Sequence, residues 1–119
     1  MSELWPTELR IAEAGRMLRV TFDSGEAFTL PAEQLRVESP SAEVKGHGPG
    51  QEQLVFGKRL VSISGAEPVG NYAVRLKFSD SHSTGIFTWP YLAKLGREQK
   101  SIWNAYIDKL KAQGRSREP

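Results

Sequence analysis

Cysteine is absent from this chain of 119 residues, which excludes disulfides, thiolate zinc sites, iron–sulfur ligation and cysteine nucleophiles. Long apolar runs are also absent, since none approaches the roughly 18–20 residues that a membrane span needs. The first residues lack the basic and apolar regions of a signal peptide. The length and the 39% hydrophobic content are ordinary for one globular domain. We therefore expect a single soluble, cytoplasmic domain that does not engage a membrane.

A large excess of charge of one sign is also absent, because sixteen basic residues against fourteen acidic ones give a formal net charge of only +2. Residues 109–119 hold four of the cations and one carboxylate. We expect one domain over residues 1–113, followed by a disordered basic tail over 114–119. A basic excess in such a tail is a poor electrostatic footprint, so we expect no nucleic-acid partner.

Alternating apolar and polar residues indicate a β-rich first half. The alternation runs over residues 16–22 and resumes over 28–30 after an Asp-Ser-Gly turn, which predicts a β-hairpin. A further strand is expected at 9–11, closed by a turn at Gly15.

The same pattern recurs later in the chain, over residues 74–78 and 87–90. Two interpretations stay open: a structural pseudo-repeat, or chance similarity between short amphipathic hairpins. Between the two hairpins we expect one more strand at 60–63 and a turn at 68–71.

After the second hairpin the apolar spacing becomes helical. Thr88 is the expected N-cap of a short helix that ends at Gly96, and an apolar stripe over 102–110 predicts a second helix ended by Gly114. Because an isolated sheet needs a covering layer, we expect the stripe to pack on it. The predicted fold class is α+β, with antiparallel β-hairpins covered by a C-terminal amphipathic helix.

Residues 39–53 show neither the two-residue alternation of a strand nor the apolar spacing of a helix, and they are rich in glycine and proline. A connection of this length is usually functional or disordered. The segment lacks the Gly-Lys-Ser/Thr ending of a nucleotide-binding loop. It contains His47, one of only two histidines; the other is His82. With carboxylates such as Glu43 and Asp80, these form a candidate metal- or small-ligand-binding set, although no strong ligand spacing supports it.

No catalytic constellation stands out in the sequence. Asp80 and His82 are two residues apart and no nucleophile elbow is present, so a hydrogen bond between them is expected to order a turn. We therefore predict that the chain is not an enzyme. Trp89 and Tyr91 would form a protein-binding patch if exposed and part of the core if buried. Trp5 is the better candidate for an exposed aromatic residue.

With these residues in view, the chain resembles the gamma-butyrobetaine hydroxylase N-terminal-like domain family. The residues that carry the resemblance are Leu35-Arg36 and the segments 68–74, 79–82, 85–89, 39–44 and 46–51, the last two being similar to the short stand-alone bacterial branch. The resemblance implies a small β-rich domain with helical cover. It also implies that the family's oxygenase chemistry is absent, because that chemistry belongs to a separate catalytic domain.

The resemblance further implies a zinc site that this sequence has lost. In the eukaryotic carnitine-pathway hydroxylases of the family, a Cys-x-Cys-x-x-Cys cluster and a later histidine bind a structural zinc. The corresponding positions here are Ser39, Ser41, Val44 and His82, so only the histidine is retained. Neutral hydroxyls are weak zinc ligands and valine is none, so we expect neither a metal nor another cofactor.

The family also occurs fused to P-loop ATPases of the iron–sulfur cluster carrier type. This implies a non-catalytic accessory or protein-interaction domain, linked to iron–sulfur cluster biogenesis, with such an ATPase as the implied partner. The alternative is a metal- or small-ligand-binding domain that uses His82 and His47. The candidate binding residues are Ser39, Ser41, Glu43, His47, Asp80, His82, Trp89 and Tyr91.

Overall fold

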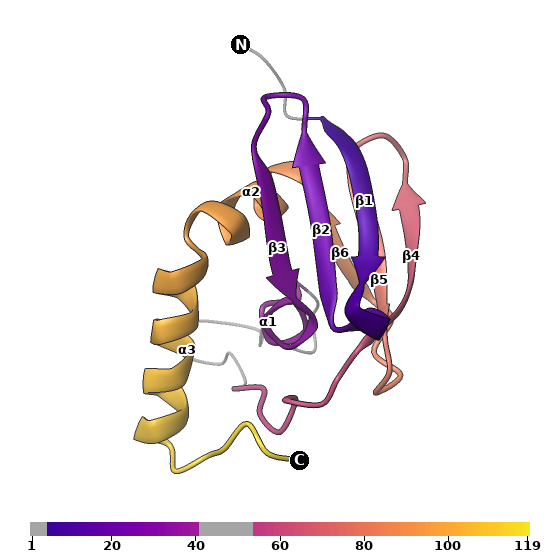
Figure 1. Ribbon diagram of the computed structural model, residues 1–119. Helices are drawn as coiled ribbons and strands as arrows, with labels where there is room; N and C mark the ends of the chain where they lie inside the picture. Colours follow the sequence, from indigo (N-terminus) through magenta and orange to yellow (C-terminus); the bar gives the residue numbers. More distant parts are fainter. Residues whose placement is uncertain (1–4, 41–53) are drawn as a thin grey trace.

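The computed structural model describes residues 5–40 and 54–119 (Figure 1). Its strands and helices follow one another along the chain as β1 (Pro6–Ala12), β2 (Met17–Phe22), β3 (Ala27–Pro31), α1 (Ala32–Val37), β4 (Ile63–Val69), β5 (Ala73–Phe78), β6 (Gly85–Thr88), α2 (Trp89–Arg97) and α3 (Gln99–Ala112). This arrangement confirms the predicted α+β class. None of the helices within these two ranges combines the length and the apolar character that crossing a bilayer requires.

The strands form two antiparallel sheets of three strands each, in the orders β1-β2-β3 and β4-β5-β6. Each sheet is followed directly by a helix, α1 or α2, so the two halves share one topology. Both halves thus have the same order of three strands and a helix, which is consistent with the pseudo-repeat interpretation. In Figure 1 the first sheet lies in front of the second.

The core lies between the two sheets, because each central strand buries alternate residues. In β2 these are Leu18, Val20 and Phe22, and β5 contributes its own alternate residues, including Leu76 and Phe78, to the same cluster. Helix α2 adds further apolar side chains to this cluster. Its N-terminus is capped as expected, since Thr88 Oγ1 accepts a hydrogen bond from the Tyr91 N–H at 3.3 Å.

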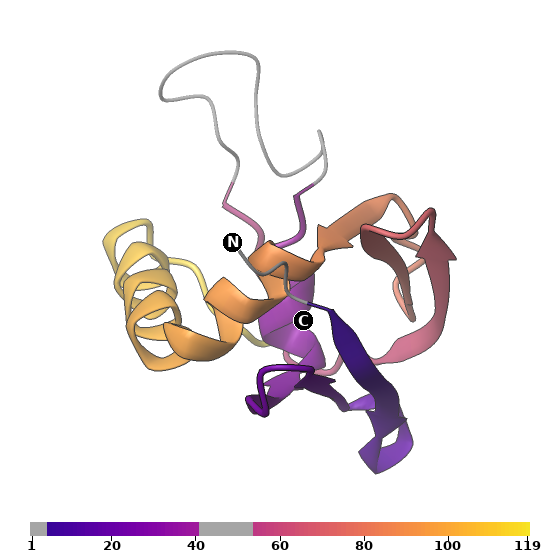
Figure 2. The same ribbon diagram turned by 90° about the horizontal axis from the view of Figure 1, so that it is seen from above.

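The last helix differs from the prediction in part: Ile102, the first residue of its stripe, packs against the core between the sheets, but the rest of the stripe does not. The buried residues of α3 are Tyr106 and Leu110, which pack with Val37 at the end of α1. The Tyr106 hydroxyl also donates to the Val55 carbonyl oxygen at 2.8 Å. Figure 2 shows α3 on the opposite side of α2 from the second sheet. Helix α2 already packs against the core between the sheets, and α3 instead packs in a second, smaller apolar cluster.

One helix was missed, and two local predictions were wrong. Helix α1 was not predicted, and the strand expected at 60–63 instead runs over Ile63–Val69. Pro68 is tolerated there because β4 is an edge strand, where a missing N–H breaks no ladder. Helix α2 continues past Gly96 to Arg97, and a Cβ atom at Gly96 would lie 2.3 Å from the Phe28 ring. This glycine therefore permits close packing of α2 on β3.

The sequence predicts a disordered tail over 114–119, whereas the structure describes these residues in contact with the body. The N–H groups of Gly57 and Arg59 each donate to a tail carbonyl, of Ser116 and Arg117, at 3.0 Å. Arg117 also makes two hydrogen bonds, of 2.8 and 2.7 Å, to the buried Glu33 carboxylate. The last residues thus lie along residues 57–59.

Candidate functional site

The predicted site residues Ser39 and His82 meet where the chain leaving α1 passes the turn between β5 and β6. The Ser39 hydroxyl lies 3.0 Å from His82 Nε2, within hydrogen-bonding distance. Ser39 is 1% exposed and His82 is 5% exposed, so the pair is buried. The resemblance assigns these two positions to a cysteine and to the histidine of the family's zinc site. Here a hydrogen bond links the same two positions.

Gly85, the first residue of β6, makes room for this pair. A Cβ atom at this position would lie 2.1 Å from Ser39 Oγ and 3.2 Å from the Phe87 ring. Such an approach is far below van der Waals contact, so a side chain here would push Ser39 away from His82.

We expect Gly85→Ala to lower the free energy of unfolding by about 2 kcal/mol, through overpacking and loss of the Ser39–His82 hydrogen bond. Ser39→Ala removes the oxygen that the new methyl group meets, so Gly85→Ala should be milder in that background. A double-mutant cycle measured by urea denaturation should give a coupling energy of about 1 kcal/mol. Simple additivity of the two substitutions would contradict the proposed contact.

Asp80 stabilises the same turn by charge. Its carboxylate accepts hydrogen bonds from Arg36 Nε at 2.8 Å and Lys58 Nζ at 2.6 Å, and from the His82 backbone N–H at 3.2 Å. Burial alone would raise the pKa of Asp80, but the hydrogen bonds from Lys58 and Arg36 outweigh it and lower the pKa to about 2. The bond to His82 that we expected therefore exists, through the backbone, and it orders the turn.

This geometry differs from a catalytic triad, in which the acid orients the imidazole ring. Asp80 instead neutralises Arg36, whose side chain is 10% exposed. Within the part of the chain that the structure describes, Arg36 Nη1 is buried without a hydrogen-bond partner. Asp80 is thus the counter-charge of a buried guanidinium, which is a structural role.

The two aromatic residues at the start of α2, Trp89 and Tyr91, pack into the body of the domain. Trp89 is 7% exposed, and its Nε1 donates to the Asn71 carbonyl oxygen at 2.9 Å. Tyr91 is half-buried, and its hydroxyl donates to the Glu38 carbonyl oxygen. Burial, reinforced by the Glu38 charge, raises the pKa of Tyr91 to about 12. By contrast Trp5 is 47% exposed, as expected, and its ring meets Trp89 edge-on.

Four further predicted residues, Ser41, Glu43, Val44 and His47, lie outside the described residues. Among residues 5–40 and 54–119 there is no group of three or more His, Asp or Glu side chains placed to hold a metal ion. The described donors, Ser39 and His82, are engaged with each other. A hydroxyl and an imidazole so arranged do not fit the family's zinc, which requires thiolates.

A second feature, which the sequence did not predict, is a basic groove of about 1130 Å³ between the first sheet and α3. Its six cations are Arg16, Arg19, Arg59, Arg97, Lys100 and Arg117. They are dispersed over almost the whole sequence, so no local charge run signals them. Only the packing of α3 and the tail beside β2 and β3 brings them together.

Two stacked three-stranded sheets, each followed by a helix and stabilised by a buried Ser–His contact, define a small α+β domain of recognisable type. The profile of the family described as gamma-butyrobetaine hydroxylase-like, N-terminal, matches residues 9–93. The chain belongs to this family. No protein with curated annotation matches it.

Solved structures support the same assignment. Two solution structures determined by NMR are similar to this chain, at 40% and 45% identity and TM-scores of 0.85 and 0.84. Each alignment covers 99% of this chain, and 93% and 88% of the other. A crystal structure from Acidithiobacillus ferrooxidans, of a DUF971-family protein of unknown function, is 44% identical with a TM-score of 0.64. That alignment covers 76% of this chain and 91% of the other.

Proposed function

We propose that this chain is a non-catalytic accessory domain that acts by binding another protein. The observation that carries the proposal is the closed Ser39–His82 contact. Its two polar groups are buried and bonded to each other, while the nearby Asp80 is held by Arg36 and Lys58. The reactive side chains of the described site are thus engaged in connecting α1 to the β5–β6 turn. This hydrogen bond lies where the resemblance places the family's metal ligands.

The proposed partner is a P-loop ATPase of the iron–sulfur cluster carrier type. Support comes from the resemblance, because the family occurs fused to such ATPases. A domain that is fused in some proteins and separate in others is suited to association with the same partner in trans. The proposed contact surface includes residues 39–51 and the turn that contains His82.

A second candidate function is metal or small-ligand binding by His82 and His47. The observation that favours it is the position of His82, which lies against Ser39 where the resemblance places the family's zinc ligands. A ligand at this place would have to displace the Ser39 hydroxyl from the imidazole.

Titration calorimetry with a purified iron–sulfur carrier ATPase, under anaerobic conditions, tests the first proposal. We expect saturable binding that weakens in a His47→Ala variant and is unchanged by Arg75→Glu, on the exposed outer face of β5. Absence of binding would contradict this partner. A parallel zinc titration followed by NMR separates the candidates: shifts confined to His47 and His82 at micromolar zinc would favour ligand binding.

A further inference from the structure

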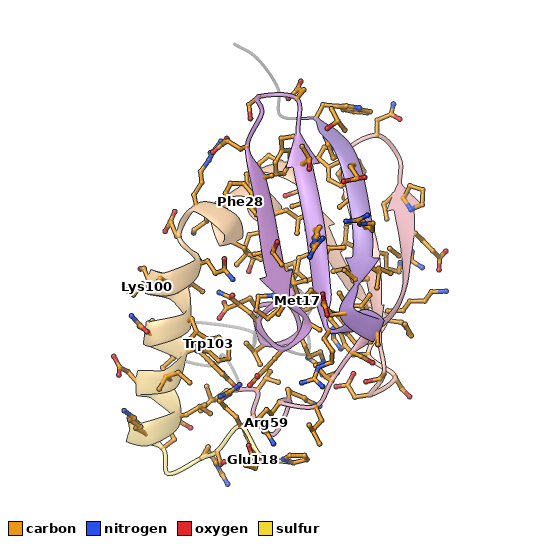
Figure 3. The ribbon with its side chains drawn as sticks, viewed as in Figure 1. Met17, Phe28, Arg59, Lys100, Trp103 and Glu118 are labelled. Atoms are coloured by element: carbon orange, nitrogen blue, oxygen red, sulfur yellow. The ribbon has the colours of Figure 1, made fainter. Side chains whose placement is uncertain are left out.

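The basic groove concentrates charge on an otherwise nearly neutral chain. Six cations line the groove with two carboxylates, Glu13 and Glu33, and two further carboxylates, Glu118 and Glu26, pair with Arg59 and Arg97. An excess of two cations remains, which equals the net charge of +2 of the whole chain. Figure 3 shows Lys100 and Trp103 along α3, Met17 at one end of β2, and Arg59 with Glu118 below them. The groove therefore runs between the first sheet and α3 and reaches the C-terminal tail.

One wall of the groove is built around the ion pair of Arg117 with Glu33. Arg117 is held by Glu33 through two hydrogen bonds of 2.8 and 2.7 Å, and its guanidinium lies 5.1 Å from the centre of the Trp103 ring. A bidentate Arg–carboxylate pair stacked on an aromatic ring is preorganised. The groove thus exists before any ligand arrives.

Two cations remain without a carboxylate partner within the described residues. Arg16 Nη2 donates to the Arg59 carbonyl oxygen at 3.4 Å, and Lys100 is exposed with no ion pair in this part of the chain. They come from opposite walls, Arg16 from the turn before β2 and Lys100 from α3. A ligand with separated negative charges would meet both.

The C-terminal tail is itself held at one end of this groove. Gly57 and Arg59 donate their N–H groups to the consecutive tail carbonyls of Ser116 and Arg117, and the Glu118 carboxylate pairs with the Arg59 guanidinium. Backbone pairing combined with a carboxylate–guanidinium contact is a common way to recognise a peptide. The tail occupies these donors, which leaves Arg16 and Lys100 to meet the carboxylates of another segment.

We propose that the groove binds an extended acidic segment of a partner protein, with its carboxylates meeting Arg16 and Lys100. This inference rests on the proposed function and names the surface and the chemistry of its partner. A compact anion such as a phosphate fits less well, because Arg59, Arg97 and Arg117 are held apart by three separate carboxylates. Nucleic acid fits less well because Arg117 covers the Trp103 ring that would stack on a base.

The test is fluorescence anisotropy with a fluorescein-labelled peptide in which glutamate alternates with serine. The control probe has glutamine in place of every glutamate. We expect the acidic peptide to bind saturably, and Arg16→Glu combined with Lys100→Glu to weaken it by about tenfold or more. Arg75→Glu with Lys111→Glu changes the net charge equally at exposed positions outside the groove and should leave affinity nearly unchanged. Circular dichroism verifies that all variants fold.

Several results would overturn the inference. They are absence of binding, equal binding of the glutamine peptide, and equal loss of affinity in both double variants. Tighter binding of inorganic tripolyphosphate or of a DNA duplex than of the peptide would also overturn it.

Binding of the purified ATPase distinguishes this inference from the proposed function. If the ATPase binds the wild type and the Arg16→Glu, Lys100→Glu variant equally, the groove inference fails and the proposed function stands. If the acidic peptide binds the groove but the ATPase does not bind, the surface stands and that partner fails.

Discussion

Asp80→Asn is expected to lower the free energy of unfolding at pH 7 by about 2–3 kcal/mol, because it leaves two cations without their counter-charge. The larger part arises at Arg36, whose side chain is 10% exposed and so gains little compensation from water. Lys58, at 24% exposed, relaxes into solvent more easily. Urea denaturation followed by tryptophan fluorescence measures the effect.

The pH dependence provides an independent signature of the same carboxylate. The pKa of Asp80 is about 2 in the folded chain, against an ordinary value of 3.8. A lowered folded pKa adds stability that is fully present above the unfolded pKa and is lost as the pH falls toward the folded one. The wild type should therefore lose this contribution between about pH 5 and pH 2. Asp80→Asn should show a correspondingly flatter curve over that window.

Glu67→Gln is the matched control. Glu67 pairs with Lys77, and both side chains are nearly half exposed, at 49% and 46%. Exposed pairs of this kind contribute less than about 1 kcal/mol. Equal losses from Asp80→Asn and Glu67→Gln would show that Arg36 does not depend on Asp80.

The strands were the most predictable part of this fold, for a simple reason. Alternation over β2 and β5 reflects one buried face per strand, and the structure buries the expected residues, Leu18 and Val20 in one and Val74 and Leu76 in the other. The N-cap at Thr88 was predictable because it depends on residues close together in sequence.

What was missed depends on packing between distant segments. Helix α1 has only six residues and follows a proline, too short for a helical period to emerge. The packing of α3 depends on α2 having already covered the sheet, and Gly96 depends on a Phe28 ring from another element. The groove is the extreme case, since Arg16 and Arg117 are separated by almost the whole chain.

The contact between Ser39 and His82 could be predicted only through the resemblance. Ser39 and His82 are separated by 43 positions, and nothing in the local pattern joins them. Placing the family's ligand positions on the sequence selected both residues, and the structure brings them into contact. Spacing alone did identify the local Asp80–His82 bond, because a two-residue separation within a turn limits the possible geometry.

Gly15→Ala is the second substitution with a large expected effect, because Gly15 lies where the two sheets meet. Its φ angle is +88°, a region that residues with a side chain rarely adopt. A Cβ atom there would also lie 2.7 Å from the carbonyl oxygen of Ile63 and 3.2 Å from the Ser62 side chain. Backbone atoms at the start of β4 cannot rotate away as a flexible side chain would.

Gly25→Ala separates the two contributions to this effect. Gly25 has a φ of +92°, close to that of Gly15, but a Cβ atom there would meet nothing within 4 Å. Gly25→Ala should therefore report backbone strain alone, about 1 kcal/mol. Gly15→Ala should lower the free energy of unfolding by about 3 kcal/mol, the excess arising from displacement of β4 against the first sheet. If urea denaturation gave the same loss for both variants, the contact between Gly15 and Ile63 would contribute nothing to the joining of the two sheets.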